Sequence, residues 1–263
     1  MPETLTAPPA SAIPEPRPVR GADLKAALSA GWRDFRAAPA FGLFFGGVFV
    51  AGGLFLYWVL AVSDQIWWTI PVTLGFPLLG PFVAVGLYEV SRRLETGEAL
   101  SWPAVLGVIL RQKDRQIPSM AAIIVIFFLF WNFLGHMIFA LFLGLRAMTN
   151  ISTSFEVFLS PSGLAMLATG TAVGAVFALV LFATSVISLP LLLDREVDFV
   201  TAMITSVKAV KASPGPMLAW AALIAAALFV AMLPAFLGLF LVLPVLGHAS
   251  WHLYRRILPA PVS

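Results

Sequence analysis

The feature that most constrains this chain is a run of 40 residues, 215–254, that contains no Asp, Glu, Lys or Arg. A helix needs about 20 apolar residues to cross the hydrocarbon core of a bilayer, so the run is too long for one span. Pro234 lies near its middle, where a helix is expected to break. We therefore predict two membrane-spanning helices here, at 215–233 and 235–254.

The remaining sequence belongs to the same class. Of the 263 residues, 60% are hydrophobic and 11% are charged, whereas soluble domains are about a quarter charged. The apolar runs lack the alternation of a β-barrel, which favours helices. The absence of cysteine excludes disulfides, thiolate catalysis and cysteine-ligated metals. We expect an all-α, polytopic membrane helix bundle.

Four further apolar segments complete a set of six predicted transmembrane helices in three hairpins. They are residues 40–62, 66–91, 119–145 and 163–190. In this scheme all but one of the 16 Lys and Arg lie on the side that holds both termini, and the exception is Arg146. The positive-inside rule therefore predicts a multi-pass protein of the bacterial inner membrane with cytoplasmic N- and C-termini.

Each predicted hairpin follows a segment in which apolar residues recur at helical spacing among charged ones. These segments are 22–37, 97–117 and 194–213, and they stop at Pro39, Pro118 and Pro214. They are too polar to span and are typical of amphipathic helices lying in the membrane interface. Residues 21–257 then form a single membrane domain of three repeat-like units, 21–93, 97–195 and 196–256. Simple periodicity is the alternative source of this similarity. Residues 1–20, rich in Pro and Ala, are expected to be a disordered cytoplasmic tail.

Two of the predicted hairpins end in similar stretches. Residues 81–93 (PFVAVGLYEVSRR) align without gaps on residues 244–256 (PVLGHASWHLYRR). Tyr88 then falls on Trp251 and Glu89 on His252, and both copies close on an arginine pair. The alignment supports internal repetition, but it does not indicate a catalytic reaction.

A candidate intramembrane polar site consists of five side chains. They are Glu89, Asn132, His136, His248 and His252. His248 and His252 are four residues apart and share a helix face, so two imidazoles could hold one metal ion or haem, with His136 approaching from another span. The alternative is that the histidines hydrogen-bond neighbouring helices. Glu89 could relay protons or pair with a histidine, or it could reach the interface beside Arg92 and Arg93.

Other residues are candidates for helix kinks or close helix packing. They are Gly42, Gly46, Pro77, Gly80, Pro81, Gly170, Gly174 and Pro244. Glycines four apart allow two helices to approach closely, and a proline inside a span frees a backbone carbonyl.

Basic residues of the three amphipathic segments are candidate contacts for anionic lipid headgroups. They are Arg33, Arg36, Arg111, Lys113, Arg115, Lys208 and Lys211. The alternative is that they only cover the hairpin ends and set the orientation. We expect membrane lipids as binding partners, with a membrane-protein partner as a second candidate, and no nucleic acid.

The sequence contains no nucleotide-binding loop, serine elbow or metalloprotease motif, so we expect no enzyme activity, no cofactor and no metal. The first hypothesis is a non-enzymatic membrane protein that assists assembly, organises partners or interacts with lipids. A small transporter or channel for a hydrophobic or protonated solute is the second, with Glu89 and His248 along its path. A haem- or metal-binding membrane protein is the third.

Four separated motifs occur in order along the chain: GWRDFRAAPAFGLFFGG, PFVAVGLYEVSRRLE, LLLDREVDFVTAMITS and PVLGHASWHLYRR. On these motifs residues 21–257 resemble a bacterial, chiefly proteobacterial, family of predicted six-span integral membrane proteins that is catalogued as a domain of unknown function. The resemblance implies a membrane fold and an inner-membrane location, and it leaves the mechanism open.

Overall fold

The computed structural model describes residues 14–61, 69–112, 115–144 and 156–259. Its regular elements in these ranges are all helices. Their bounds are α1 Gly21–Ala37, α2 Pro39–Ala61, α3 Thr69–Thr96, α4 Trp102–Gln112, α5 Ile117–Leu143, α6 Glu156–Leu159, α7 Pro161–Ser185, α8 Ser188–Asp194, α9 Phe199–Ala212, α10 Pro214–Met232 and α11 Leu239–Ile257. The all-α prediction is confirmed for this part of the chain.

Four helical segments in the described ranges are long and apolar enough to cross a membrane. They are Pro39–Val59, Ile117–Leu143, Pro161–Asp194 and Pro214–Met232. The other two predicted spans correspond to α3 and α11, which are 28 and 19 residues long and carry arginines in their last turns. The six-span count therefore stays a prediction.

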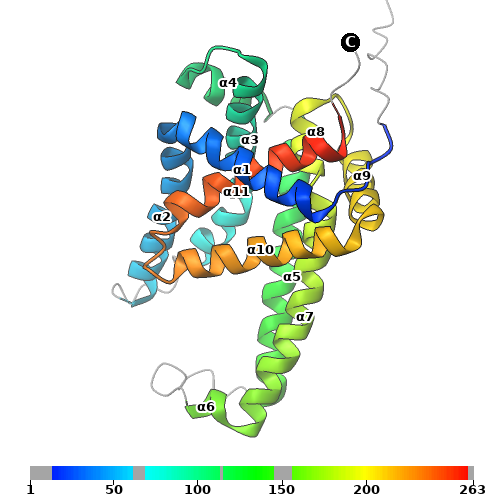
Figure 1. Cartoon of the computed structure of the whole chain (residues 1–263). Helices are drawn as coiled ribbons and strands as arrows, with labels where there is room; N and C mark the ends of the chain where they lie inside the picture. Colours follow the sequence, from blue (N-terminus) through cyan, green and yellow to red (C-terminus); the bar gives the residue numbers. More distant parts are fainter. Residues whose placement is uncertain (1–13, 62–68, 113–114, 145–155, 260–263) are drawn as a thin grey trace, which may run out of the picture.

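The hairpins do not form a parallel bundle. α5 and α7 pack against each other and project from the rest of the molecule (Figure 1), whereas α10 runs crosswise to their long axis. α1 and α11 lie side by side across the same region. α2 contacts α3, α5 contacts α7 and α10 contacts α11, but the arrangement of six spans in three hairpins stays a prediction.

The three segments predicted to be amphipathic helices are α1, α4 and α9. Each of these helices packs against the end of another repeat-like unit. α4 contacts α3 of the first unit, α9 contacts α7 and α8 of the second, and α1 contacts α11 of the third. The first and third units are thereby joined although they are far apart in sequence. These helices are held by protein contacts as well as by any membrane surface.

The α1–α11 contact is close because α1 carries a glycine at its centre. A Cβ added at Gly31 would lie 2.5 Å from the backbone nitrogen of Ala249 and 2.7 Å from the carbonyl oxygen of Val245. No side chain fits there, so the two backbones approach as in small-residue helix contacts. This contact makes α11 one of the most enclosed helices, with Trp251 and Tyr254 completely buried.

The predicted fourth span is broken into α7 and α8, and proline chemistry explains the break. Pro190 has no backbone N–H to bond the carbonyl of Val186. The N–H of Ile187 also leaves the helical pattern and donates to the hydroxyl of Ser206 on α9 at 3.1 Å. Ser188 donates back to the carbonyl of Thr184, a pattern that bends helices. As a result α8 is an independent element that reaches the ends of α3 and α11.

The main core lies where α1, α8, α9 and the C-terminal halves of α3 and α11 meet. The segment before α1 joins this core. Val19 is buried and its N–H bonds the hydroxyl of Ser213, while the N–H of Arg17 bonds the carbonyl of Ile257. The end of the predicted disordered tail thus packs against the protein because it can satisfy its backbone groups there. Residues 1–13 lie outside the described ranges.

Candidate functional site

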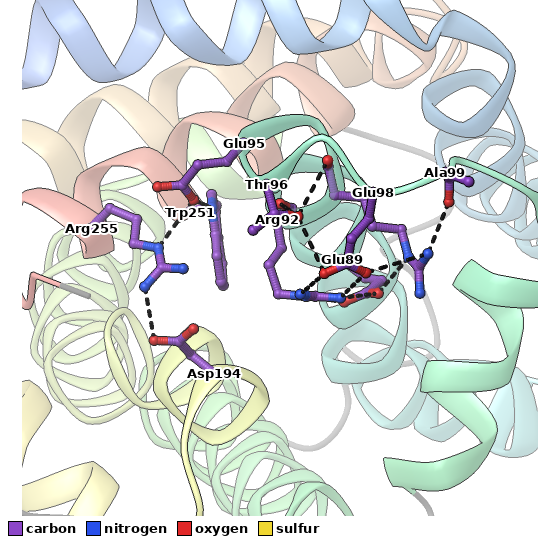
Figure 2. A network of polar contacts seen from close by, with 10 residues as sticks. Glu89, Arg92, Glu95, Thr96, Glu98, Ala99, Asp194, Trp251 and Arg255 are labelled. Carbon is purple, nitrogen blue, oxygen red and sulfur yellow. Dashed lines mark hydrogen bonds and ion pairs between the residues drawn. The ribbon is translucent and has the colours of Figure 1, made fainter. Parts of the chain in front are cut away.

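The C-terminal ends of α3, α8 and α11 meet at one arginine. Arg255 of α11 lies 3.1 Å (Nε) from Glu95 Oε2 of α3 and 3.0 Å (Nη1) from Asp194 Oδ2 of α8 (Figure 2). Its guanidinium carbon is 4.8 Å from the centroid of the Trp251 ring. Trp251 Nε1 donates to Glu95, and Tyr254 donates to Asp194 at 2.6 Å. Every member of this set therefore has a partner of complementary charge or hydrogen-bonding type.

Helix dipoles explain why Arg255 belongs at this place. A carboxylate near the C-terminal end of a helix faces the negative end of the dipole and is disfavoured there. Glu95 and Asp194 both occupy such positions. Because Arg255 contacts both, one cation compensates two unfavourably placed acids and joins three helices. We call the side chains that gather here, together with those of α1 described below, the polar end of the molecule.

Glu89 is nearly inaccessible, with 1% of its side chain exposed, and it is fully engaged. Arg92 contacts both carboxylate oxygens, at 2.8 and 2.9 Å, and Arg93 contacts one of them at 2.6 Å (Figure 2). Glu98 then bonds Arg92 from the other side at 2.7 Å. Of the two interpretations of Glu89, the geometry agrees with pairing to the adjacent arginines; α3 does contact α11, yet Glu89 turns to its own helix end.

The two histidines of α11 are held by different helices. His248 is completely buried, and its Nδ1 lies 2.8 Å from the hydroxyl of Ser91 on α3. His252 Nε2 lies 2.7 Å from Asp34 Oδ2 on α1. Burial raises the pKa of Asp34, but the hydrogen bonds from His252 and Ser91 outweigh it, so the pKa lies below its usual value. These contacts tie α11 to two neighbours, as the hydrogen-bonding interpretation expects.

The remaining two members of the predicted polar site lie elsewhere. Asn132 donates to the carbonyl of Phe128, and His136 bonds the carbonyl of Asn132 at 2.7 Å, so both contacts stay within α5. His136 is exposed on the projecting hairpin. The structure therefore separates the five predicted residues into two places. No cluster of three or more potential metal ligands occurs among the residues it describes.

The residues predicted for kinks and packing also divide. Gly42 and Gly46 face α11, where added Cβ atoms would lie 3.0 Å from Pro244 and 2.9 Å from the carbonyl of Leu239. Gly174 abuts the Trp131 ring, whereas Gly170 and Gly80 face open space. Pro77 and Pro81 lie within α3, and Pro244 within α11, without ending either helix.

The predicted headgroup contacts are mostly exposed. Arg33, Arg36, Arg111, Lys208 and Lys211 all lie on the surface, and no ion pair with an acid is found for them within the described ranges. Arg115 pairs with Glu196. Lys113 lies outside the described residues.

Sequence reasoning missed several members of the polar end. Asp34, Ser91, Glu95, Asp194 and the roles of Trp251 and Arg255 depend on contacts between units far apart in the chain. One signal was available: acids at the ends of apolar runs are disfavoured unless a cation is near. The aligned pair Tyr88 and Trp251 also meet, with ring centroids 6.4 Å apart.

With the geometry described, comparisons with known proteins place the chain in a broad class. The profile of a family described as predicted integral membrane protein (DUF2189) matches residues 69–194. This range runs from the start of α3 to the end of α8 and includes Glu89, Glu95 and Asp194. Searches of curated proteins and of solved structures gave no match.

The family match and the four apolar helices identify the chain as an integral membrane protein. The resemblance expected over residues 21–257 is thus supported over the central half of the chain. The bacterial range, the six spans and the inner membrane remain expectations.

Proposed function

We propose that this chain is a non-enzymatic protein of the bacterial inner membrane that interacts with anionic lipids through the exposed basic residues of α1 and α9 and so organises its membrane surroundings. In this proposal α3 and α11 complete six spans and both termini are cytoplasmic, which requires α10 to cross the bilayer obliquely, since it runs crosswise to α5 and α7. This was the first of the three hypotheses from the sequence, and the distribution of charge supports it better than it supports transport or haem binding.

The supporting observation is that the acids near the polar end are paired with bases of the protein, whereas several bases of α1 and α9 are exposed to solvent. Asp23, Asp34, Glu89, Glu95 and Asp194 all contact a base inside the protein. The exposed bases of α1 and α9 described above have no such acid in the described ranges. The surface next to the membrane therefore carries excess positive charge, which attracts anionic headgroups with about 1 kcal/mol per basic residue.

The transport hypothesis receives less support. A proton-relaying carboxylate must be able to release its partners, yet Glu89 is held by two arginines inside the protein. Glu89 and His248, the two residues predicted to line the transport path, also have different partners, since Glu89 contacts Arg92 and Arg93 and His248 contacts Ser91. The haem or metal hypothesis uses His248 and His252, and these two side chains instead contact Ser91 and Asp34. His136, the third candidate ligand, bonds the carbonyl of Asn132 within α5.

The test of lipid interaction compares wild type with a Lys208→Gln/Lys211→Gln variant. Both proteins are extracted in mild detergent with added phosphatidylglycerol or phosphatidylcholine, and retained lipid is counted by native mass spectrometry. We expect retention of phosphatidylglycerol alone to fall, by about fivefold per lysine removed. A Lys208→Arg/Lys211→Arg control keeps the charge and should behave as wild type. Equal retention of the anionic lipid by wild type and the Gln variant would contradict the proposal.

The proposed topology has a direct test because the chain contains no cysteine. Single cysteines at Ala99, Ala212, Ser162 and Leu237 report on four exposed positions. In intact cells a membrane-impermeant maleimide should label the last two only, since the six-span scheme puts them outside. Labelling of Ala99→Cys or Ala212→Cys in intact cells would overturn the orientation.

A further inference from the structure

Two polar side chains stand on the outer surface of the projecting hairpin. Asn132 and His136 are four residues apart on α5 and share a helix face. His136 is exposed and Asn132 is partly buried. The exposed side chains around them are apolar, namely Leu129, Phe133 and Met137. Polar side chains in membrane spans almost always face the interior of a helix bundle, so this pair is out of place unless something covers it.

Both residues lie in the part of α5 that is expected to face hydrocarbon. α5 has 27 residues, which makes it about 40 Å long against about 30 Å of hydrocarbon. Asn132 and His136 lie roughly 16 and 10 Å before its end at Leu143, so both are below the headgroups of a centred helix. The His136 ring also points away from that end, because its Nδ1 bonds the carbonyl of Asn132 one turn earlier.

The hydrogen bonds within α5 leave a donor and an acceptor on this face. A carbonyl only accepts, so Nδ1 of His136 is the donor and Nε2 of the neutral ring is an acceptor. Asn132 uses one amide hydrogen on the carbonyl of Phe128 and keeps the other. Within the described ranges neither Nε2 nor this second hydrogen meets a partner. Unpaired polar groups in hydrocarbon cost free energy, so an occupant of this face must supply matching groups.

A second copy of this chain supplies those groups at the right depth, whereas an acyl chain has neither a donor nor an acceptor. Copies inserted in the same orientation pack about a two-fold axis along the membrane normal, so each residue of α5 meets its own depth in the partner. Asn132 and His136 differ in depth by about 6 Å, a distance that the two side chains can bridge together. The Asn132 amide of each copy then donates to His136 Nε2 of the other.

We propose that this chain forms a homodimer in the membrane through the face of α5 that carries Asn132 and His136. Hydrogen bonds between spanning helices are formed by polar side chains of this kind, and Leu129 and Phe133 pack around them. The interface goes beyond the proposed function, since it does not use the exposed basic residues of α1 and α9. It requires only that α5 lies in the membrane, so the dimer and the lipid interaction can fail independently.

Self-association is measured with the full chain in phosphatidylcholine vesicles, which carry no net headgroup charge. Donor- and acceptor-labelled copies are mixed at several protein-to-lipid ratios, and energy transfer gives the dissociation constant. We expect wild type to dimerise. His136→Leu or Asn132→Leu should raise the dissociation constant about tenfold, since each removes both hydrogen bonds of the symmetric dimer. Met137→Leu is the matched control, because it replaces one exposed apolar side chain by another on the same helix, and it should behave as wild type.

A mixing experiment tests the reciprocal pairing. A dimer of one Asn132→Leu copy and one His136→Leu copy keeps one bond between asparagine and histidine, whereas a dimer of either variant with itself keeps none. Each variant is first checked for folding by circular dichroism and thermal unfolding. We expect the mixed pair to associate about threefold more tightly than either variant alone. Equal association of mixed and unmixed variants would overturn the proposal.

Cross-linking locates the interface on α5. Leu129 shares the face of Asn132 three residues later, whereas Phe130 lies about 100° further around the helix at nearly the same depth. Both are exposed, and the chain contains no cysteine of its own. We expect oxidation to join Leu129→Cys copies and not Phe130→Cys copies. Cross-linking of Phe130→Cys alone, or a wild type that stays monomeric, would overturn the proposal and leave this face to another protein or to lipid.

Discussion

The polar end and the α5–α7 hairpin are built on opposite principles. At the polar end Trp251 and Tyr254 are completely buried and lie beside paired charges. On the hairpin Phe133 and Leu141 expose 64% and 77% of their surface. The hairpin helices are nonetheless more apolar than α3 and α11, since they contain segments apolar enough to span a membrane whereas α3 and α11 carry arginines in their last turns. In a membrane protein, then, apolar sequence marks contact with lipid, and the packed core lies where charged residues meet.

The largest expected effect on the free energy of unfolding comes from removing Arg255, the cation that joins three helices at the polar end. Arg255→Met leaves Glu95 and Asp194 without their partner near two helix ends. We expect the free energy of unfolding to fall by about 2–3 kcal/mol, because Asp194 is largely buried and loses its cation, whereas Glu95 is partly exposed and is screened by solvent. Thermal and denaturant unfolding in detergent measure this. Arg256→Met is the matched control, because its pair with Asp23 is largely exposed and should contribute at most about 1 kcal/mol.

Adding one methyl group should act in opposite directions in the two regions. Gly31→Ala places a Cβ within 2.5 Å of the α11 backbone, and overpacking of this kind costs about 1–3 kcal/mol. Gly170→Ala adds the same group in open space on α7, where alanine favours the helix by up to about 1 kcal/mol. Unfolding midpoints of the two variants, measured together, test this. Equal loss of stability in both would show that the hairpin is packed as tightly as the polar end.

Acid should weaken the polar end through Asp34. The pKa of this carboxyl is lower in the folded protein than its usual 3.8, so ionised Asp34 stabilises the fold. That contribution is complete above pH 3.8 and is lost as the pH falls through the lower folded pKa. The gap in unfolding temperature between wild type and Asp34→Asn should therefore be present at pH 7 and shrink toward pH 3. A gap that does not change with pH would mean that the charge of Asp34 does not contribute.

The smallest expected effect on stability belongs to the exposed bases. Lys208→Gln alone should change the free energy of unfolding by less than about 0.5 kcal/mol, since it removes no described contact. The same measurement in detergent and in anionic nanodiscs sharpens the comparison. If the lysine binds headgroups, the variant should lose stability only in the anionic membrane.

The helices themselves could be read from the sequence. Apolar length, the three closing prolines and the short charged segments predicted α1, α2, α5, α9 and α10 to within a few residues. These signals are local, because proline removes a backbone donor and apolar runs reflect the surrounding solvent. The start of α8 was missed, since the break depends on Ser206 accepting a backbone N–H from another helix.

The contacts of the candidate site were harder to predict from the sequence than the helices. Glu89, His248 and His252 were singled out from the sequence as polar residues in apolar segments, but their partners were not determined by spacing alone. Ser91 reaches His248, and Asp34 reaches His252, only because α1 and α3 both pack on α11. His136 was grouped with the other histidines by residue type, and it lies on a different part of the molecule.

The sequence by itself determined that this chain is a helical membrane protein and where most of its helices begin and end, because the cost of unpaired backbone groups in lipid is a local constraint. Tertiary structure alone decided which charges meet. Arg255 contacts Glu95 and Asp194 from helices that lie about 160 and 61 positions away in the chain, and no local pattern encodes such a distance. It also decided that Gly135 of α5 and Gly170 of α7 face open space, since a glycine can equally bring two helices together, as Gly31 does.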